Sequence, residues 1–106
     1  MKRNIKRREC VDVEKIQDGV IDLLIEYLRS CKSRCAFFTS SKLAKMYADK
    51  YGCDNVKLIS TIVKNMLVYL CDNNAIRLVG KCSRGTMYIA CKNDLELIKR
   101  LIQDFD

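Results

Sequence analysis

The stretch DNVKLISTIVKNMLVYL, residues Asp54 to Leu70, decides how the rest of the chain is interpreted. Apolar residues recur in it at steps of three and four, which predicts a helix with one apolar side. These apolar residues are Ile59, Ile62, Val63, Met66, Leu67 and Leu70. The other side carries lysine and hydroxyl side chains: Lys57, Ser60, Thr61 and Lys64. No acidic residue lies between Asn55 and Leu70, so the segment is either an ordinary amphipathic helix or one that can fill a DNA major groove.

Charge is unevenly distributed along the 106 residues, whose formal net charge is +7. Residues 27–93 contain twelve basic side chains and three acidic ones, and residues 2–8 add five more cations. The other acidic residues concentrate in 9–26 and 94–106. Cations confined to particular elements are typical of a surface that meets phosphates.

The chain contains no apolar run near the roughly 18 residues that a membrane span requires. Its basic start is followed by a charged segment and not by the apolar stretch of a signal peptide. We therefore expect one small domain in the cytoplasm, or in the host cytoplasm if the protein is viral, with no membrane partner.

Seven cysteines are many for a cytoplasmic domain of this size. Structural zinc sites usually contain closely paired ligands, whereas the tightest pair here is Cys31 and Cys35 and the chain has no histidine, so we expect no metal. Intracellular disulfides do occur in hyperthermophiles, so we favour disulfides in a protein of a hyperthermophilic archaeon or an archaeal virus. Cys31 or Cys35 could reach Cys53, and Cys82 could bridge to Cys91 if these two face each other across a hairpin.

Residues 1–11 form a basic N-terminal arm, which is either a solubilising tail or a tether to the DNA backbone or minor groove. A helix should begin near Asp12, a suitable N-cap residue, and continue to about Leu28. Its acidic outer side should point away from nucleic acid. That side carries Asp18, Asp22 and Glu26.

A second helix should follow a short strand at residues 35–38, with Thr39 as its N-cap and Gly52 at its end. A turn of three to four residues then leads into the helix described first, with Asp54 as the expected cap. Two short helices joined by a turn that contains glycine form a helix-turn-helix.

The end of the chain predicts a hairpin and a last helix. Residues 75–82 and 86–91 have the composition of strands, and the turn between them contains Gly85. Asn93 should cap a helix over residues 94–105. Its apolar stripe either packs on the core or forms a homodimer interface.

The order of these elements, together with FTSSKLAKMYADKYG at residues 38–52 and YLCDNNAIRLV at residues 69–79, resembles the winged-helix family of DNA-binding proteins. The resemblance covers roughly residues 12–92. It implies an α+β, mostly α fold, a winged helix-turn-helix with a three-helix core and a small antiparallel β-wing. Residues 93–106 would add an extra C-terminal helix.

In that family the second helix of the helix-turn-helix enters the major groove, here residues 54–70, and the wing, here residues 76–91, contacts the backbone or minor groove. By position, the resemblance implies as base-reading residues Asn55, Lys57, Ser60, Thr61 and Lys64. It implies as phosphate contacts Thr39, Ser40, Ser41 and Lys42. It implies as wing contacts Lys81, Ser83 and Arg84.

The function implied is sequence-dependent binding of double-stranded DNA by a small, homodimeric transcriptional regulator. The alternative is a protein-interaction module of transcription or replication machinery that binds nucleic acid weakly or without sequence preference, because a fold does not fix a function. Binding of single strands usually requires exposed aromatic residues, but most aromatic residues here lie in apolar stripes.

We expect no enzyme, no cofactor and no small-molecule substrate. The chain has no histidine, no phosphate-cradling glycine loop and no convincing carboxylate pair. A cysteine nucleophile would need a base partner, and none can be nominated.

Overall fold

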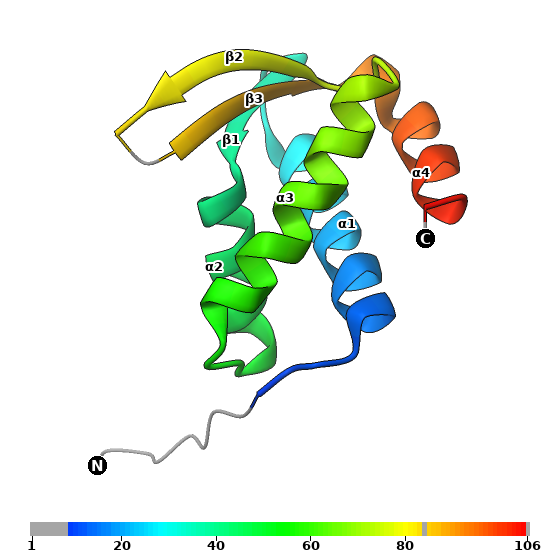
Figure 1. The fold of residues 1–106 in the computed structure, drawn as a ribbon. Helices are drawn as coiled ribbons and strands as arrows, with labels where there is room; N and C mark the ends of the chain where they lie inside the picture. Colours follow the sequence, from blue (N-terminus) through cyan, green and yellow to red (C-terminus); the bar gives the residue numbers. More distant parts are fainter. Residues whose placement is uncertain (1–8, 84, 106) are drawn as a thin grey trace.

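Four α-helices and a three-stranded antiparallel sheet make up residues 9–83 and 85–105, the part of the chain that the computed structural model describes (Figure 1). The elements in order are α1 (Val13–Ser30), β1 (Cys35–Thr39), α2 (Ser40–Tyr51), α3 (Val56–Asp72), β2 (Arg77–Cys82), β3 (Gly85–Cys91), the 3-10 helix η1 (Lys92–Asp94) and α4 (Leu95–Gln103). The sheet lies across one end of the helices (Figure 1). The expected α+β, mostly helical class is confirmed.

Side-chain caps set where α1 and α2 begin. Asp12 Oδ1 accepts a hydrogen bond from the Lys15 amide at 3.2 Å, and Thr39 Oγ1 accepts one from the Lys42 amide at 3.1 Å. Gly52 follows α2 with a φ of 67°, the left-handed conformation that ends helices. These three boundaries were predicted from residue type alone.

The start of α3 differs from the expected one. Asn55, and not Asp54, is the N-cap residue, and it makes no side-chain capping bond. Its amide group binds the backbone of Cys10 instead: Oδ1 accepts from the Cys10 amide at 2.9 Å, and Nδ2 donates to the Cys10 carbonyl at 2.7 Å. The prediction of Asp54 as the cap was wrong, because the contact between Asn55 and Cys10 joins residues 45 positions apart and cannot be read from the sequence around the turn.

One apolar core lies among α1, α2 and α3 and extends to the sheet and to α4. All six residues predicted for the apolar side of α3 are buried. Ile98 of α4 is fully buried in the same core, and the Phe105 and Tyr69 rings lie 4.7 Å apart between centroids. The C-terminal helix therefore packs on the core.

Gly19 allows α1 and α2 to approach closely. A Cβ at this position would lie 2.5 Å from Cε2 of Tyr47, whose side chain is buried. Gly19→Ala improves helix propensity by about 1 kcal/mol, but displacing a packed ring costs about 1–3 kcal/mol. We expect urea unfolding to show a net loss of about 1 kcal/mol, whereas Asp22→Ala, at an exposed site of the same helix, should be neutral or stabilising. A Gly19→Ala protein more stable than the wild type would contradict this close contact.

The central strand of the sheet is β3, with β1 on one side and β2 on the other. The predicted hairpin is present, since β2 and β3 pair from Arg77↔Ile89 to Cys82↔Gly85, with an irregularity before Gly80. The strand predicted at residues 35–38 pairs with β3 as well. Because β1 leads directly into α2, this pairing connects the hairpin to the start of α2.

Two disulfides link distant parts of the described chain, Cys10–Cys53 and Cys35–Cys91, while Cys31, Cys71 and Cys82 are unpaired. The expectation of disulfides is confirmed, but the expected pairings were wrong. Cys82 lies opposite Gly85 at the end of the hairpin, and Cys91 faces Cys35 in β1. The segment around Cys10 lies against the α2–α3 turn, which brings its sulfur to Cys53. The two cysteines are 43 residues apart, so no pattern in the sequence around either one predicts the bond.

Candidate nucleic-acid interface

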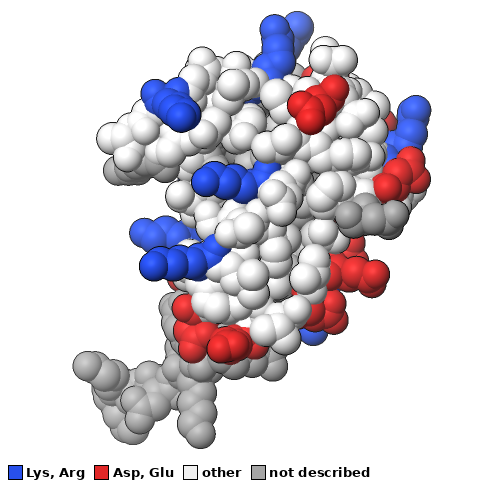
Figure 2. All heavy atoms as spheres, viewed as in Figure 1, with Lys and Arg blue, Asp and Glu red and all other residues white. Residues whose placement is uncertain are grey.

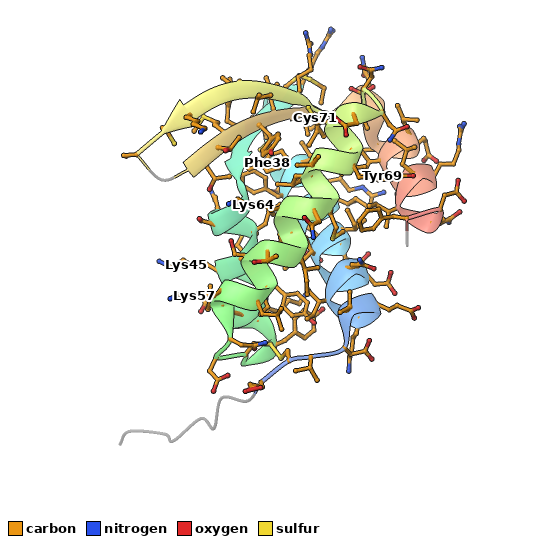
Figure 3. All side chains as sticks on the ribbon, in the orientation of Figure 1. Phe38, Lys45, Lys57, Lys64, Tyr69 and Cys71 are labelled. Carbon is orange, nitrogen blue, oxygen red and sulfur yellow. A yellow bond between two sulfur atoms is a disulfide. The ribbon has the colours of Figure 1, made fainter. Side chains whose placement is uncertain are left out.

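Lysine and hydroxyl side chains line the solvent side of α3. Lys57, Thr61 and Lys64 are exposed and Ser60 is half-buried, as the helical spacing predicted. Lys57 and Lys64 point to the same open side as Lys45 of α2 (Figure 3). Thr61 Oγ1 donates to the Lys57 carbonyl at 3.1 Å, so this hydroxyl is partly engaged within the helix.

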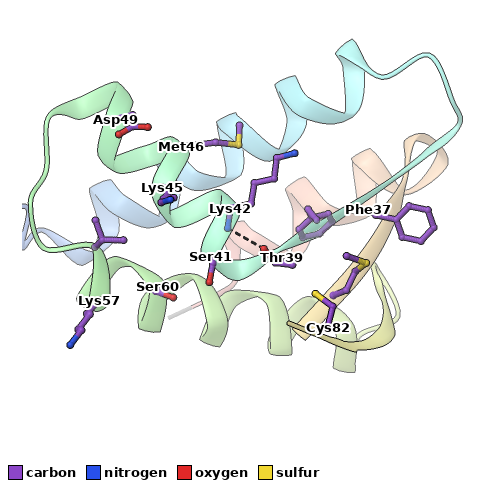
Figure 4. A pocket seen from close by; sticks show the side chains of 13 residues that line it. Phe37, Thr39, Ser41, Lys42, Lys45, Met46, Asp49, Lys57, Ser60 and Cys82 are labelled. Carbon is purple, nitrogen blue, oxygen red and sulfur yellow. Dashed lines mark hydrogen bonds between the residues drawn. The ribbon is translucent and has the colours of Figure 1, made fainter. Parts of the chain in front are cut away.

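A groove of about 970 Å³ lies between α2, α3 and the sheet, and we call it the α2–α3 groove (Figure 4). Apolar side chains form part of its surface: Phe37, Phe38, Met46, Val56 and Met87. Polar and cationic side chains form much of the rest: Thr39, Ser41, Lys42, Lys45, Lys57 and Ser60. Both α2 and α3 thus supply cations to one hollow.

Lys45 is a groove residue that sequence reasoning missed. It is exposed on α2 four residues after Ser41, and residues at this spacing lie on the same side of a helix. The sequence prediction selected only the first turn of α2. Extending the helical spacing from Ser41 by one turn would have found Lys45.

The four residues predicted as phosphate contacts at the start of α2 differ from one another in their exposure and in their contacts. Thr39 and Ser40 are 7% and 4% exposed, and Thr39 caps the helix, whereas Ser41 is exposed in the groove. Lys42 Nζ donates to Tyr27 Oη at 3.1 Å and lies 4.7 Å from the centre of that ring. The charge of Lys42 is therefore directed toward α1.

A smaller hollow of about 290 Å³ joins the groove to the end of the hairpin. Ser41, Ser60 and Cys82 line both hollows, so the two are adjacent. Lys64 of α3 and Lys81 of β2 line the smaller one. The structure thus brings predicted residues from α2, α3 and β2 to one surface.

Among the residues that the structure describes, three predicted contact residues do not line these hollows, namely Asn55, Thr61 and Ser83. Asn55 binds the Cys10 backbone at the N-terminal end of α3. Ser83 is exposed in the hairpin turn. Arg84 lies outside the residues that the structure describes.

Basic and acidic side chains lie on different parts of the surface (Figure 2). In this view several basic side chains follow the left side, along α2, α3 and the hairpin, and others lie at the top and on the right. Acidic side chains occupy the lower end and the right side, with one near the top. The acidic residues of α1 are exposed as predicted: Asp18, Asp22 and Glu26. An anion would therefore approach the side that holds the α2–α3 groove.

The chemistry that this site offers is mainly that of cations and hydroxyl groups, with one carboxylate, Asp49, in the lining of the groove. Burial raises the pKa of Tyr88 above its ordinary value of 10.0, and Cys71 adds to the shift, so this phenol keeps its proton to a higher pH than an exposed tyrosine does. Within residues 9–83 and 85–105, no group of three or more histidine, cysteine or acidic side chains is placed to hold a metal. No helix of the same residues is long and apolar enough to cross a membrane.

Comparison with protein-family models, with curated proteins and with solved structures finds no match. A functional proposal for this chain rests on the shape and charge of the α2–α3 groove and of the hollow beside it.

Proposed function

We propose that this chain is a winged-helix protein that binds double-stranded DNA in a sequence-dependent manner, as a small transcriptional regulator. In this proposal α3 enters the major groove, and the hairpin over residues 76–91 is a wing that contacts the backbone or minor groove. The observation that carries the proposal is the meeting of cations from three elements on one hollowed side. These cations are Lys45 of α2, Lys57 and Lys64 of α3, and Lys81 of β2.

The spacing of these cations suits a duplex. Lys57 and Lys64 are seven residues, or about two turns, apart along α3, so both can face the same major groove. Ser60 lies between them and can both donate and accept hydrogen bonds at base edges. Ser41 and Lys81 flank α3 on neighbouring elements, where they can reach phosphates on the borders of the groove.

The first test is fluorescence anisotropy with a short random-sequence duplex and a matched single strand over a series of salt concentrations. Each neutralised phosphate contributes about −0.9 to the slope of the logarithm of the binding constant against the logarithm of the salt concentration. If the four lysines of the α2–α3 groove and the smaller hollow each neutralise one phosphate, the slope is about −3 to −4. The duplex should bind more tightly than the single strand. Equal affinity for both, or no duplex binding at low salt, would contradict the proposal.

We extend the proposal to a homodimer formed through the outer side of α4. Leu97 and Leu101, one turn apart, remain partly exposed there although Ile98 is buried. A two-fold dimer would present two α3 helices to half-sites about one turn of DNA apart. Sedimentation velocity should find twice the chain mass, and a monomer at every concentration would exclude this interface.

The second candidate function is a protein-interaction module of transcription or replication machinery. Three large apolar side chains of the sheet favour it, because Phe37, Leu78 and Val79 are each more than half exposed. Exposed apolar patches often mark protein interfaces. A protein that binds no duplex at low salt would leave this candidate as the better one.

A further inference from the structure

Three exposed side chains of α3 lie outside both hollows and form what we call the α3 stripe: Thr61, Asn65 and Val68. Thr61 lies four residues after Lys57 and three before Lys64, and Val68 lies four residues after Lys64. Residues at these spacings share one side of a helix, so the stripe lies beside the two lysines. A duplex that meets both lysines would therefore meet the α3 stripe as well.

The two ends of the α3 stripe offer methyl groups. Thr61 Oγ1 donates to the Lys57 carbonyl at 3.1 Å, one turn earlier, so the hydroxyl proton of this side chain is used within the helix. The γ-methyl is the branch of Thr61 that makes no such bond. Val68 is 49% exposed and adds two more methyl groups, seven residues after Thr61.

The middle of the α3 stripe is an amide. Asn65 is exposed, and no hydrogen bond within the described part of the chain engages its side chain. A side-chain amide has a carbonyl oxygen that accepts and an NH₂ group that donates. This pair of groups is complementary to adenine in the major groove, where N6 donates and N7 accepts.

The rest of the α3 surface offers little for the direct reading of G·C pairs. Arginine is the side chain best suited to guanine, and a carboxylate can accept a hydrogen bond from the cytosine amino group. Residues 56–71 contain neither arginine nor an acidic residue. Lysine can also donate to guanine, so Lys57 and Lys64 are the residues that would act if the preferred site consisted of G·C pairs.

We propose that the α3 stripe selects A·T pairs in the major groove, with Asn65 bound to adenine and the methyl groups of Thr61 and Val68 packed on the C5-methyl groups of thymine. The inference rests on the proposed function and names the class of DNA sequence that the same helix reads. Adenine presents a donor and an acceptor in the major groove, and thymine presents a methyl group. The neighbouring lysines supply affinity for any duplex, whereas the stripe supplies the sequence preference.

The test begins with the selection of a preferred site from a pool of random-sequence duplexes by the full-length protein. The selected core should consist mainly of A·T pairs. A second duplex then carries uracil in place of each thymine of that core, which removes the C5-methyl groups and leaves the base pairing unchanged. Fluorescence anisotropy should show a loss of affinity of about fourfold for each thymine methyl that the protein contacts.

A third duplex carries inosine·cytosine pairs in place of the A·T pairs of the core. Inosine lacks the 2-amino group of guanine, so these pairs resemble A·T in the minor groove and G·C in the major groove. Since the proposed contacts all lie in the major groove, this duplex should bind at least about tenfold more weakly than the A·T duplex.

Variants of the α3 stripe assign the effect to particular side chains. Thr61→Ser removes a methyl group and retains the hydroxyl, and Val68→Ala removes two methyl groups. The double variant should bind the thymine and uracil duplexes equally, because the partners of the thymine methyl groups are then absent. Val13→Ala is the matched control, since Val13 is 46% exposed on α1, and it should keep the full difference between the two duplexes. Asn65→Ala should weaken binding to the A·T duplex about tenfold.

All these substitutions are at exposed positions, and circular dichroism checks the fold of each variant. A selected core of G·C pairs, or equal affinity of the wild type for the thymine and uracil duplexes, would overturn the inference. An inosine·cytosine duplex that binds as tightly as the A·T duplex would also overturn it, because the preference would then arise in the minor groove.

A difference between the thymine and uracil duplexes that persists in the double variant would show that the methyl groups act through the shape of the DNA or on another part of the protein, and it too would overturn the inference. A wild type that binds no duplex overturns the proposed function as well. Duplex binding without any preference among the three duplexes overturns this inference alone.

Discussion

Replacing Lys57 and Lys64 together by glutamate is expected to raise the Kd for duplex DNA at least about a hundredfold, because each change removes a cation that faces the DNA and adds a negative charge that the phosphates repel. Both side chains are exposed, so the free energy of unfolding should change by no more than about 0.5 kcal/mol per site. Anisotropy measures the first quantity and urea unfolding the second.

The matched control reverses Arg29 and Lys32, two exposed cations at and just after the end of α1, which changes the net charge by the same amount away from the α2–α3 groove. It should weaken duplex binding only several-fold, through the weaker long-range field. An equal loss in both double variants would show that net charge drives binding and that the groove has no special role.

Replacing Cys35 and Cys91 by serine is expected to lower the free energy of unfolding of the oxidised protein by about 4 kcal/mol. The disulfide links positions 56 residues apart, and losing it restores the conformational freedom of that long loop to the unfolded chain. Denaturant unfolding under oxidising conditions measures the change.

Cys82→Ser is the control for that experiment, since Cys82 is exposed and unpaired. It should alter the free energy of unfolding by no more than about 0.5 kcal/mol. A loss below about 1 kcal/mol in the double variant would contradict this prediction. It would indicate that residual contacts between the β1 and β3 segments already restrict the unfolded chain.

The helices and the hairpin were predictable because their signals are local. The six buried positions of α3 follow from the three- and four-residue spacing, and the ends of α2 follow from Thr39 and Gly52. The role of Asn55 and the partner of Cys53 were not predictable, since both depend on Cys10, more than 40 residues earlier in the chain.

Part of the candidate site was predictable for the same reason. The exposure of Lys57 and Lys64 follows from helical periodicity. The burial of Ser40 and the turn of Lys42 toward Tyr27 depend on what packs against the start of α2, and residue type alone does not determine this.

The most direct test of the central claim is a nuclear magnetic resonance titration, in which a short duplex is added to isotope-labelled protein and the backbone amide shifts are followed. The largest changes should fall on Ser41, Lys45, Lys57, Ser60, Lys64 and Lys81, the residues that line the groove and the hollow beside it. Largest changes on the acidic side of α1 instead, around Asp18 and Glu26, or no change at low salt, would contradict the proposal that this groove binds DNA.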